Sequence, residues 1–284
     1  MGHAGTLDPL AEGLLIVLVN KATKISKYFI SLDKEYEVKI KLGVETDTWD
    51  SDGEVLKTKR VDKLNKERVL KVISELKGKY YQELPFYSAV KYMGKPLYYY
   101  ARKGEKIYLE KRIVNIYEIK LLSLKKDVLD LKIKCSSGTY IRSIAREIGS
   151  ILGYGGIVTQ LLRTKIGNFY VEDSLEAEKI IELISDKWSL RNKSYLLPIE
   201  KILENKPDLY ISKEYKKHVV NGHPICGYMI DEKRTVDYIL EKGNIVKIKD
   251  LDENILAIHE IISEESLSGI IKKEIRFTKS IVIF

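Results

Sequence analysis

Between residues 34 and 43 apolar and charged side chains alternate without interruption, and no other pattern limits the possible folds of this chain so strongly. Successive side chains of a strand point to opposite faces, so the alternation predicts a strand with one face in a hydrophobic core and the other in water. Tyr36 begins the apolar row. It is either a core aromatic or a stacking platform at one end of the strand, and spacing alone leaves both interpretations open.

Hydrophobic periodicity predicts the other elements. Apolar residues at helical spacing predict helices over residues 22–31, 66–77 and 141–152, and strand-like runs lie at residues 113–122, 128–135, 243–248 and 255–262. Gly78 and Gly138 stand where the second helix and the second of these strands should end. The pattern predicts a chain of mixed helices and strands followed by a small β-rich domain, and we expect an α+β fold in which helices flank a mixed, mainly antiparallel sheet.

The first fourteen residues have the composition of a functional site. Asp8 has glycines on both sides and is followed by Pro9. An Asp-Pro pair also suits the start of a helix, with the aspartate as N-cap. The next stretch, residues 14–19, is apolar at every position. It predicts a short strand buried on both faces and favours a loop that presents the Asp8 carboxylate at the entrance to that strand.

The chain is basic and rich in tyrosine, with 49 lysines and arginines against 41 acidic residues, a formal charge of +8, and 19 tyrosines. Basic charge mixed with aromatic side chains suits RNA or single-stranded nucleic acid, whose bases can stack on aromatic rings. The richest stretch is residues 80–106. The alternative interpretation is a lysine-rich surface whose charges are only solvated, with the aromatic rings in the core.

No pattern in the sequence indicates a cofactor, a metal or a membrane. Cys135 and Cys226 are too far apart for a zinc knuckle, so a reducing, cytoplasmic location is expected. The acidic residues 45–54 do not form a calcium loop, because Thr48 and Lys59 occupy positions where an EF-hand needs carboxylates. The longest apolar run is too short to cross a membrane. We therefore expect a soluble protein that uses no metal or cofactor.

A run of motifs extends from residue 2 to roughly residue 165. The first is Gly-His-Ala-Gly-Thr-Leu-Asp-Pro at residues 2–9. Others follow in order at residues 34–36, 46–53, 85–91, 101–104, 138–142 and 161–163. Together they resemble the TruB family of tRNA pseudouridine-55 synthases, whose nucleophile is the aspartate of the first motif. The resemblance implies a tRNA-modifying isomerase with the pseudouridine synthase fold.

The resemblance implies catalytic roles for three residues. Asp8 would be the nucleophile, attacking either the sugar C1′ or the uracil ring, and Arg142 would pair with it. Tyr140 would contact the target base and is a candidate for removing the proton from carbon 5. The reaction breaks the N-glycosidic bond and rejoins the freed uracil through carbon 5, which requires a well-placed carboxylate but no metal or cofactor.

Substrate-binding roles follow for four further residues. Tyr36 would stack on the flipped-out uracil, and Leu162 would close the apolar wall of its pocket. His3 would enter the T loop as the base leaves its stack. Asp50 matches a family aspartate near the active site that can orient an arginine.

The resemblance also implies two domains. Residues 1–203 would form the catalytic domain and residues 204–284 a PUA-like RNA-binding domain. The partner would be the T stem-loop of tRNA, bound by a monomer. Family members carry a Lys-Pro-x-Gly segment before the catalytic turn, and the sequence shows none ahead of that turn. We therefore expect an N-terminally truncated enzyme, and the alternative is a noncatalytic RNA-binding or tRNA-folding protein.

Overall fold

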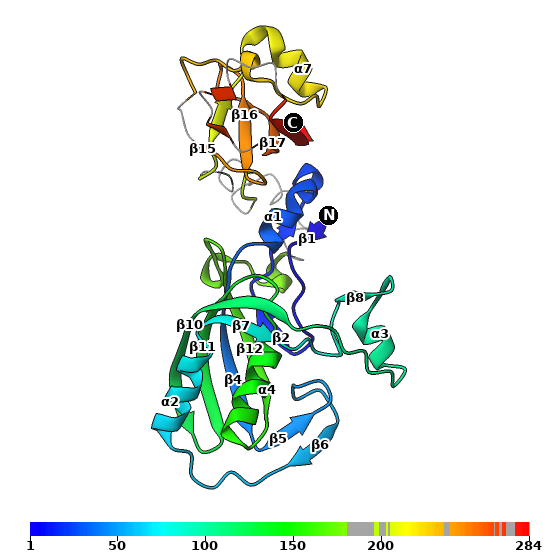
Figure 1. Cartoon of the computed structure of the whole chain (residues 1–284), viewed down its shortest axis with the longest axis vertical. Coiled ribbons are helices and arrows are strands. Elements are labelled where there is room, and N and C mark those ends of the chain that lie inside the picture. Colours follow the sequence, from blue (N-terminus) through cyan, green and yellow to red (C-terminus); the bar gives the residue numbers. More distant parts are fainter. Residues whose placement is uncertain are drawn as a thin grey trace. The chain divides into compact units, whose positions relative to one another are not determined.

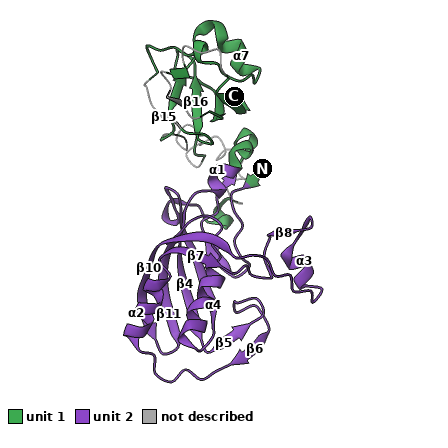
Figure 2. Cartoon of the chain, viewed as in Figure 1, with its two compact units in different colours: residues 1–2, 18–26, 176–284 green, residues 3–17, 27–175 purple. Residues whose placement is uncertain are grey.

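The computed structural model describes residues 1–180, 196–198, 203, 205–235, 239–263, 265–266, 269–270 and 276–283. The chain divides into two compact units, which Figure 2 shows in different colours. The N-terminal unit comprises His3–Val17 and Lys27–Leu175, and the C-terminal unit comprises Met1–Gly2, Leu18–Ser26 and Glu176–Phe284. The sequence predicted a domain boundary between residues 203 and 204. Residue 204 lies outside the described residues, so this boundary stays a prediction.

The N-terminal unit is built on a seven-stranded sheet (Figure 1). The strand order is β13-β12-β4-β11-β10-β7, and β2 pairs with β12 off this path. The strands are β2 (Ala11–Gly13), β4 (Lys34–Leu42), β7 (Gly78–Gln82), β10 (Arg112–Lys125), β11 (Val128–Cys135), β12 (Gly156–Ile166) and β13 (Phe169–Tyr170). All these pairings are antiparallel except that of β2 with β12. The predicted mixed, mainly antiparallel sheet is therefore confirmed.

Helices α2 (Lys66–Glu75) and α4 (Ile141–Leu152) cover one face of this sheet (Figure 1). The core between them and the sheet includes the alternate residues of β4 and β11, so both predicted strands bury the predicted faces. The side chain of Asn65 caps α2 by accepting a hydrogen bond from the backbone of Arg68 at 3.1 Å. Helix α4 ends at Gly153, whose left-handed φ of 83° favours glycine.

The strand predicted over residues 14–19 is wrong. The structure contains only β3 (Val17–Leu18) within that stretch, and β1 (Gly2–His3) precedes it. Within residues 14–19 the side chains of Leu14 and Leu18 are buried, whereas those of Leu15, Val17 and Val19 are exposed. Among the described strands β2 pairs only with β12 and so lies at an edge of the large sheet, and the chain that follows β2 leaves this sheet. There β3 pairs with β1, and the backbone N–H of Ala4 donates to the carbonyl of Ile16 at 2.9 Å. Asp8 thus precedes an edge rather than a central strand.

The remaining elements of the N-terminal half are short. The helix predicted over residues 22–31 forms as a 3-10 turn, η1 (Asn20–Ile25), followed by α1 (Ser26–Ile30). A hairpin of β5 (Val44–Thr46) and β6 (Val55–Thr58) follows β4, and η2 (Val171–Asp173) follows β13.

The connection between β7 and β10, residues 83–111, is an excursion from the sheet that contains β8 (Lys91–Tyr92), β9 (Lys95–Pro96) and α3 (Leu97–Ala101). Met93 and Gly94 both have positive φ, as a tight hairpin turn requires. This excursion has a small core of its own, formed by Leu84, Val90 and Leu97, against which Tyr140 packs.

The C-terminal unit contains a four-stranded sheet in the order β14-β16-β17-β19 and a small β15-β18 pair. Its elements are β14 (Asp208–Tyr210), η5 (Lys213–Tyr215), α7 (Lys216–Val220), η6 (Gly227–Met229), β15 (Ile239–Leu240), β16 (Ile245–Lys249), β17 (Ile255–Ile261), β18 (Glu265–Ser266) and β19 (Thr278–Ile283). The predicted β-rich C-terminal region is confirmed. Within the described residues, none of the helices has the length and apolar character needed to span a membrane.

Candidate active site

Asp8 lies in a tight turn ahead of β2. Its carbonyl oxygen accepts a hydrogen bond from the backbone N–H of Ala11 at 2.8 Å, with Pro9 at the second position of the turn, where its fixed φ is favourable. The chain then enters a strand, which rules out the alternative in which Asp8 caps a helix. The side chain of Asp8 is 27% exposed, so this turn presents a carboxylate that a ligand can reach.

Arg142, in the first turn of α4, holds that carboxylate from the inside of the protein. Its Nε donates to Oδ2 of Asp8 at 2.8 Å, and its Nη2 donates to Oδ1 at 2.9 Å. The guanidinium is nearly inaccessible, with 3% of the side chain exposed. Two parallel charge-assisted hydrogen bonds fix the orientation of a carboxylate as well as balancing its charge.

The remaining N–H groups of Arg142 are also directed at acceptors. Nη1 donates to the carbonyl of Thr48 at 3.0 Å and lies 3.4 Å from Oδ2 of Asp50, and Nη2 donates to the carbonyl of Tyr87 at 3.0 Å. A guanidinium has five N–H donors, and here each has an acceptor within reach. Arg142 therefore cannot rotate without breaking several contacts, and the position of Asp8 is fixed with it.

Asp50 lies in the acidic loop that follows β5. The structure brings it against Arg142, and its Oδ1 accepts hydrogen bonds from the Thr48 hydroxyl and from the backbone of Asp52. Burial raises the pKa of Asp50, while Thr48 and Arg142 oppose that rise. Within the described residues no cluster of three or more histidine, cysteine or acidic side chains could hold a metal ion.

Two tyrosines lie within electrostatic reach of the Asp8 carboxylate. Tyr36 is buried on β4, and Tyr140 is the N-cap residue of α4. Burial raises the pKa of both phenols, and the negative charge of Asp8 acts in the same direction. Both hydroxyl groups therefore carry their protons at neutral pH.

Arg163 supports the turn from the opposite side, a role that sequence reasoning missed. Its side chain is buried on β12 and donates to three backbone carbonyls, those of Leu14 at 2.8 Å and of Thr6 and Gly5 at 3.2 Å. These carbonyls lie on both sides of Asp8 in the sequence. Arg163 belongs to the motif at residues 161–163, but polar residues also lie elsewhere along β12, so nothing in the sequence pattern distinguished its side chain as buried.

Gln82 is a second residue that the sequence did not single out. It is fully buried at the end of β7, donates to the carbonyl of Gly138 at 2.7 Å and accepts from the backbone of Tyr140 at 2.9 Å. The amide thus holds both ends of the turn that precedes Arg142. A lone glutamine at the end of a short strand gives no sequence signal for this contact.

Two predicted site residues lie at the margin of this cluster. Leu162 is half-buried on β12, and one of its methyl groups lies against Gly13, where a Cβ would come within 2.9 Å of it. His3 is an exposed residue of β1. The structure therefore gathers Asp8, Tyr36, Asp50, Tyr140 and Arg142, with Arg163 and Gln82 behind them.

Comparison with known proteins agrees with this arrangement. A family model described as TruB family pseudouridylate synthase (N terminal domain) matches residues 1–141. The tRNA pseudouridine synthase B of Clostridium tetani is 37% identical over 253 residues, covering 89% of this chain and 83% of that protein. The protein of the same name from Francisella philomiragia is 38% identical over 263 residues, covering 89% of this chain and 86% of its own.

Solved structures show the same fold. The structure of an H/ACA RNP bound to a substrate RNA containing 2'-deoxyuridine matches with a TM-score of 0.72 and 21% identity, covering 100% of this chain and 75% of the other. A chain of a Cbf5-Nop10-Gar1 complex matches with a TM-score of 0.69 and 23% identity, covering 100% and 74%. The fold is thus that of the pseudouridine synthases. At 37% identity over most of both chains, this protein belongs to the TruB family of pseudouridylate synthases.

Proposed function

We propose that the protein isomerises uridine 55 in the T loop of tRNA to pseudouridine, with Asp8 as the nucleophile. The observation that carries this proposal is the bidentate pair of Asp8 and Arg142, in which a reachable carboxylate is fixed by a buried guanidinium. A purely RNA-binding protein has no need for such a carboxylate beside its basic surface. The relatives named above are tRNA pseudouridine synthases, which supports tRNA as the substrate.

The chemistry needs a nucleophile and a confined space. The bond between C1′ and N1 breaks, the uracil rotates while bound, a bond between C1′ and carbon 5 forms, carbon 5 loses its proton and N1 gains one. Asp8 attacks either C1′ or the uracil ring and leaves again when the new bond forms. Arg142 keeps the carboxylate aimed during these steps, since its own contacts prevent it from moving.

The base must leave its stack to reach Asp8, and the surrounding residues receive it. Tyr36 stacks on the flipped uracil, Leu162 closes the apolar wall, Asp50 orients Arg142, and His3 enters the T loop. Tyr140 contacts the base and removes the carbon 5 proton. Because burial raises the pKa of its hydroxyl, Tyr140 begins the reaction protonated. It gives this proton to N1 of the freed uracil, and the resulting phenolate then takes the carbon 5 proton.

Residues 204–284, which belong to the C-terminal unit, are proposed to form a PUA-like module that adds to the RNA-binding surface. Its support is a compact four-stranded sheet with an apolar core of its own. We propose that the enzyme acts as a monomer in the cytoplasm, where its tRNA substrate is found. The basic charge of the chain predicts that tRNA binding weakens steeply as salt concentration rises.

The test is tritium release from a tRNA T-arm labelled at carbon 5 of the target uridine. The wild-type chain should release tritium to water, and Asp8→Asn should release none while still binding the RNA. Asp52→Asn, which removes an exposed carboxylate close to the same site, is the matched control and should keep wild-type turnover. If the wild-type chain binds the RNA without releasing tritium, the alternative of a noncatalytic RNA-binding protein replaces this proposal.

A further inference from the structure

Ser88, in the excursion after β7, carries a buried hydroxyl without a partner. Its side chain is 5% exposed, and its Oγ has no hydrogen-bond partner among the described residues. Most buried hydroxyl groups are hydrogen-bonded, because an unpaired one has lost its contacts with water and gained nothing in return. The Ser88 hydroxyl is therefore free to donate to a group that becomes a strong acceptor only during the reaction.

The segment that contains Ser88 is fixed to the candidate active site. The carbonyl of Tyr87, the preceding residue, accepts a hydrogen bond from Arg142 at 3.0 Å. The carbonyl of Ser88 itself accepts one from the backbone of Tyr98 at 3.2 Å. The position of the Ser88 hydroxyl is thus tied to the guanidinium that holds Asp8.

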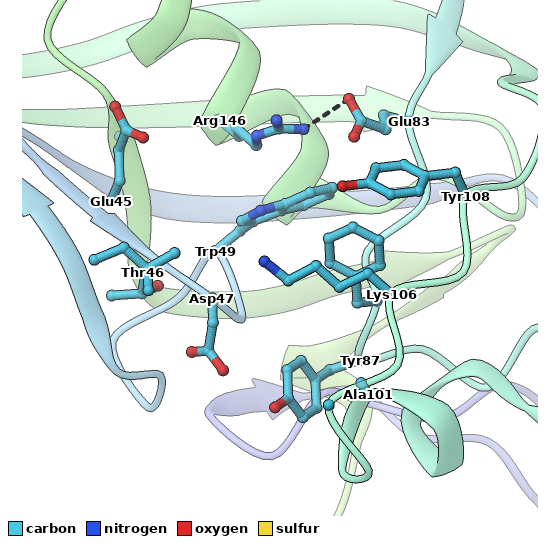
Figure 3. Close-up of a pocket in the computed structure, with 14 residues that line it drawn as sticks. Glu45, Thr46, Asp47, Trp49, Glu83, Tyr87, Ala101, Lys106, Tyr108 and Arg146 are labelled. Carbon is cyan, nitrogen blue, oxygen red and sulfur yellow. Dashed lines mark ion pairs between the residues drawn. The ribbon is translucent and has the colours of Figure 1, made fainter.

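Ser88 does not share the surroundings of its two preceding neighbours. Phe86 and Tyr87 line a cavity of about 240 Å³ together with Trp49, and Figure 3 shows the ring of Tyr87 at this cavity. Ser88 is not among the residues that line it. Its hydroxyl is therefore buried away from the cavity.

Tyr140 packs against the small core of the same excursion, formed by Leu84, Val90 and Leu97. Gln82 accepts a hydrogen bond from the backbone of Tyr140 at 2.9 Å, so both the ring and the backbone of this tyrosine are held. Burial raises the pKa of the Tyr140 hydroxyl, and the hydroxyl of Ser88 opposes this rise. A neutral hydroxyl has such an effect only at close range, so the two groups lie near each other.

The phenolate of Tyr140 needs a hydrogen-bond donor. In the proposed reaction Tyr140 gives its proton to N1 of the freed uracil and stays negatively charged until it takes the carbon 5 proton. A buried charge is costly unless a donor is bonded to it. The N–H groups of Arg142 already have acceptors, so Arg142 cannot serve the phenolate without breaking one of these contacts. Ser88 has no such contact to break.

We propose that Ser88 is a positioning residue of the reaction, whose hydroxyl donates a hydrogen bond to the phenolate oxygen of Tyr140 between the two proton transfers. Ser88 keeps its own proton throughout. The proton that Tyr140 gives to N1 is replaced by the one that it takes from carbon 5, so both residues end the reaction as they began it. The inference rests on the proposed function, because it takes Tyr140 to exchange protons with the uracil.

The first test compares two buried serines. Ser88→Ala removes a hydroxyl without a partner, whereas Ser143→Ala removes one that donates to the carbonyl of Glu83 at 2.7 Å. Turnover is followed by tritium release from the labelled T-arm, and stability by urea denaturation.

Ser88→Ala should lower kcat by roughly 10- to 100-fold, the effect of losing one hydrogen bond to a charged group. Its KM and its free energy of unfolding should stay unchanged, because the hydroxyl contacts neither the RNA nor an acceptor in the folded protein. Ser143→Ala should show the reverse, a loss of stability with wild-type kcat, since the carbonyl of Glu83 loses its donor.

A second test separates an effect on the phenolate from a structural effect. Replacing Tyr140 by 3-fluorotyrosine makes the phenol more acidic, so its phenolate depends less on a donor. In this background Ser88→Ala should cost much less in kcat than it does beside an ordinary tyrosine. The comparison is a double-mutant cycle, and it isolates the coupling between the two hydroxyl groups.

Equal losses of kcat in both backgrounds would overturn the proposal, because Ser88 would then act independently of the acidity of Tyr140. Wild-type kcat in Ser88→Ala would overturn it as well and leave the isomerase intact. A wild-type chain that binds the RNA but releases no tritium would refute the isomerase itself, and the role of Ser88 with it.

Discussion

Asp8 and Arg142 are 134 positions apart in the sequence and form a bidentate ion pair with distances of 2.8 and 2.9 Å. The carboxylate comes from a turn at the edge of the sheet, and the guanidinium comes from the first turn of a helix that covers the sheet. Two residues that the fold alone brings together thus define the reactive centre. Their different exposures give the carboxylate access to a substrate and the guanidinium shelter from water.

Replacing Arg142 should affect both stability and catalysis. In Arg142→Met the buried carboxylate of Asp50 loses its cation, and the carbonyls of Thr48 and Tyr87 lose their donor. We expect the free energy of unfolding to fall by about 3 to 5 kcal/mol. Urea denaturation followed by circular dichroism measures this change.

Arg142→Lys separates the two effects, because it keeps the charge but cannot make two parallel hydrogen bonds to Asp8. We expect kcat to fall by roughly 10² to 10³-fold in this variant, with a smaller loss of stability than in Arg142→Met. Wild-type kcat in Arg142→Lys would mean that a positive charge alone is sufficient beside Asp8.

Arg163 should act as a positioning residue. In Arg163→Met the carbonyls of Gly5, Thr6 and Leu14 lose their donor, so the turn that carries Asp8 is no longer fixed. A displacement of about 1 Å can cost about 10²-fold in rate, and we expect a loss of that order in kcat with little change in KM. Arg60→Met removes one charge from an exposed side chain and is the control. A rise in KM of about 10²-fold with unchanged kcat would contradict this role.

Gly13 should tolerate no side chain. Its φ is 101°, and a Cβ there would come within 2.5 Å of the carbonyl oxygen of Arg163. Gly153 also has a positive φ, of 83°, but a Cβ there meets nothing within 4 Å. Gly153→Ala should therefore cost only the strain of a left-handed residue, about 1 to 2 kcal/mol. Gly13→Ala should cost more and also reduce kcat, and equal unfolding free energies for the two variants would argue against the clash.

The elements with a regular pattern could be predicted from the sequence. The alternation beginning at Tyr36 predicted β4, and the helical spacing over residues 141–152 predicted α4 with the bounds that the structure shows. The apolar run at residues 14–19 led to the wrong prediction of a buried strand, because a uniform run does not reveal whether both sides of a strand have neighbours. Periodicity reports the burial of an element but not its position in a sheet.

The candidate site could be predicted only in part. The resemblance named Asp8 and Arg142, and the structure shows how they meet. Arg163 and Gln82 hold backbone carbonyl and N–H groups, and such contacts leave no pattern in the side chains of the residues they hold. The cavity at Trp49 is likewise assembled from segments that are distant in sequence. Contacts of this kind depend on the tertiary fold.

The last prediction concerns the C-terminal unit, where His259 is fully buried on β17. Its Nδ1 lies 2.9 Å from the hydroxyl of Thr278, and its Nε2 has no hydrogen-bond partner among the described residues. Burial lowers the pKa of His259 to about 4, from an ordinary value of 6.5. The unfolded chain therefore binds a proton at a higher pH than the folded chain does.

This difference should make the C-terminal unit less stable in acid. As pH falls below the ordinary value of 6.5, the unfolded state gains a proton that the folded state does not bind until about pH 4. The contribution of His259 to the free energy of unfolding should thus decline across this window by up to about 3 kcal/mol and change no further below it.

Carboxylates also titrate at the acid end, so the wild type must be compared with His259→Gln, which has no titrating imidazole. Urea denaturation at about pH 7 and about pH 4.5 should show a larger loss of stability for wild type than for His259→Gln. Equal losses would mean that the imidazole becomes protonated without unfolding the strand around it.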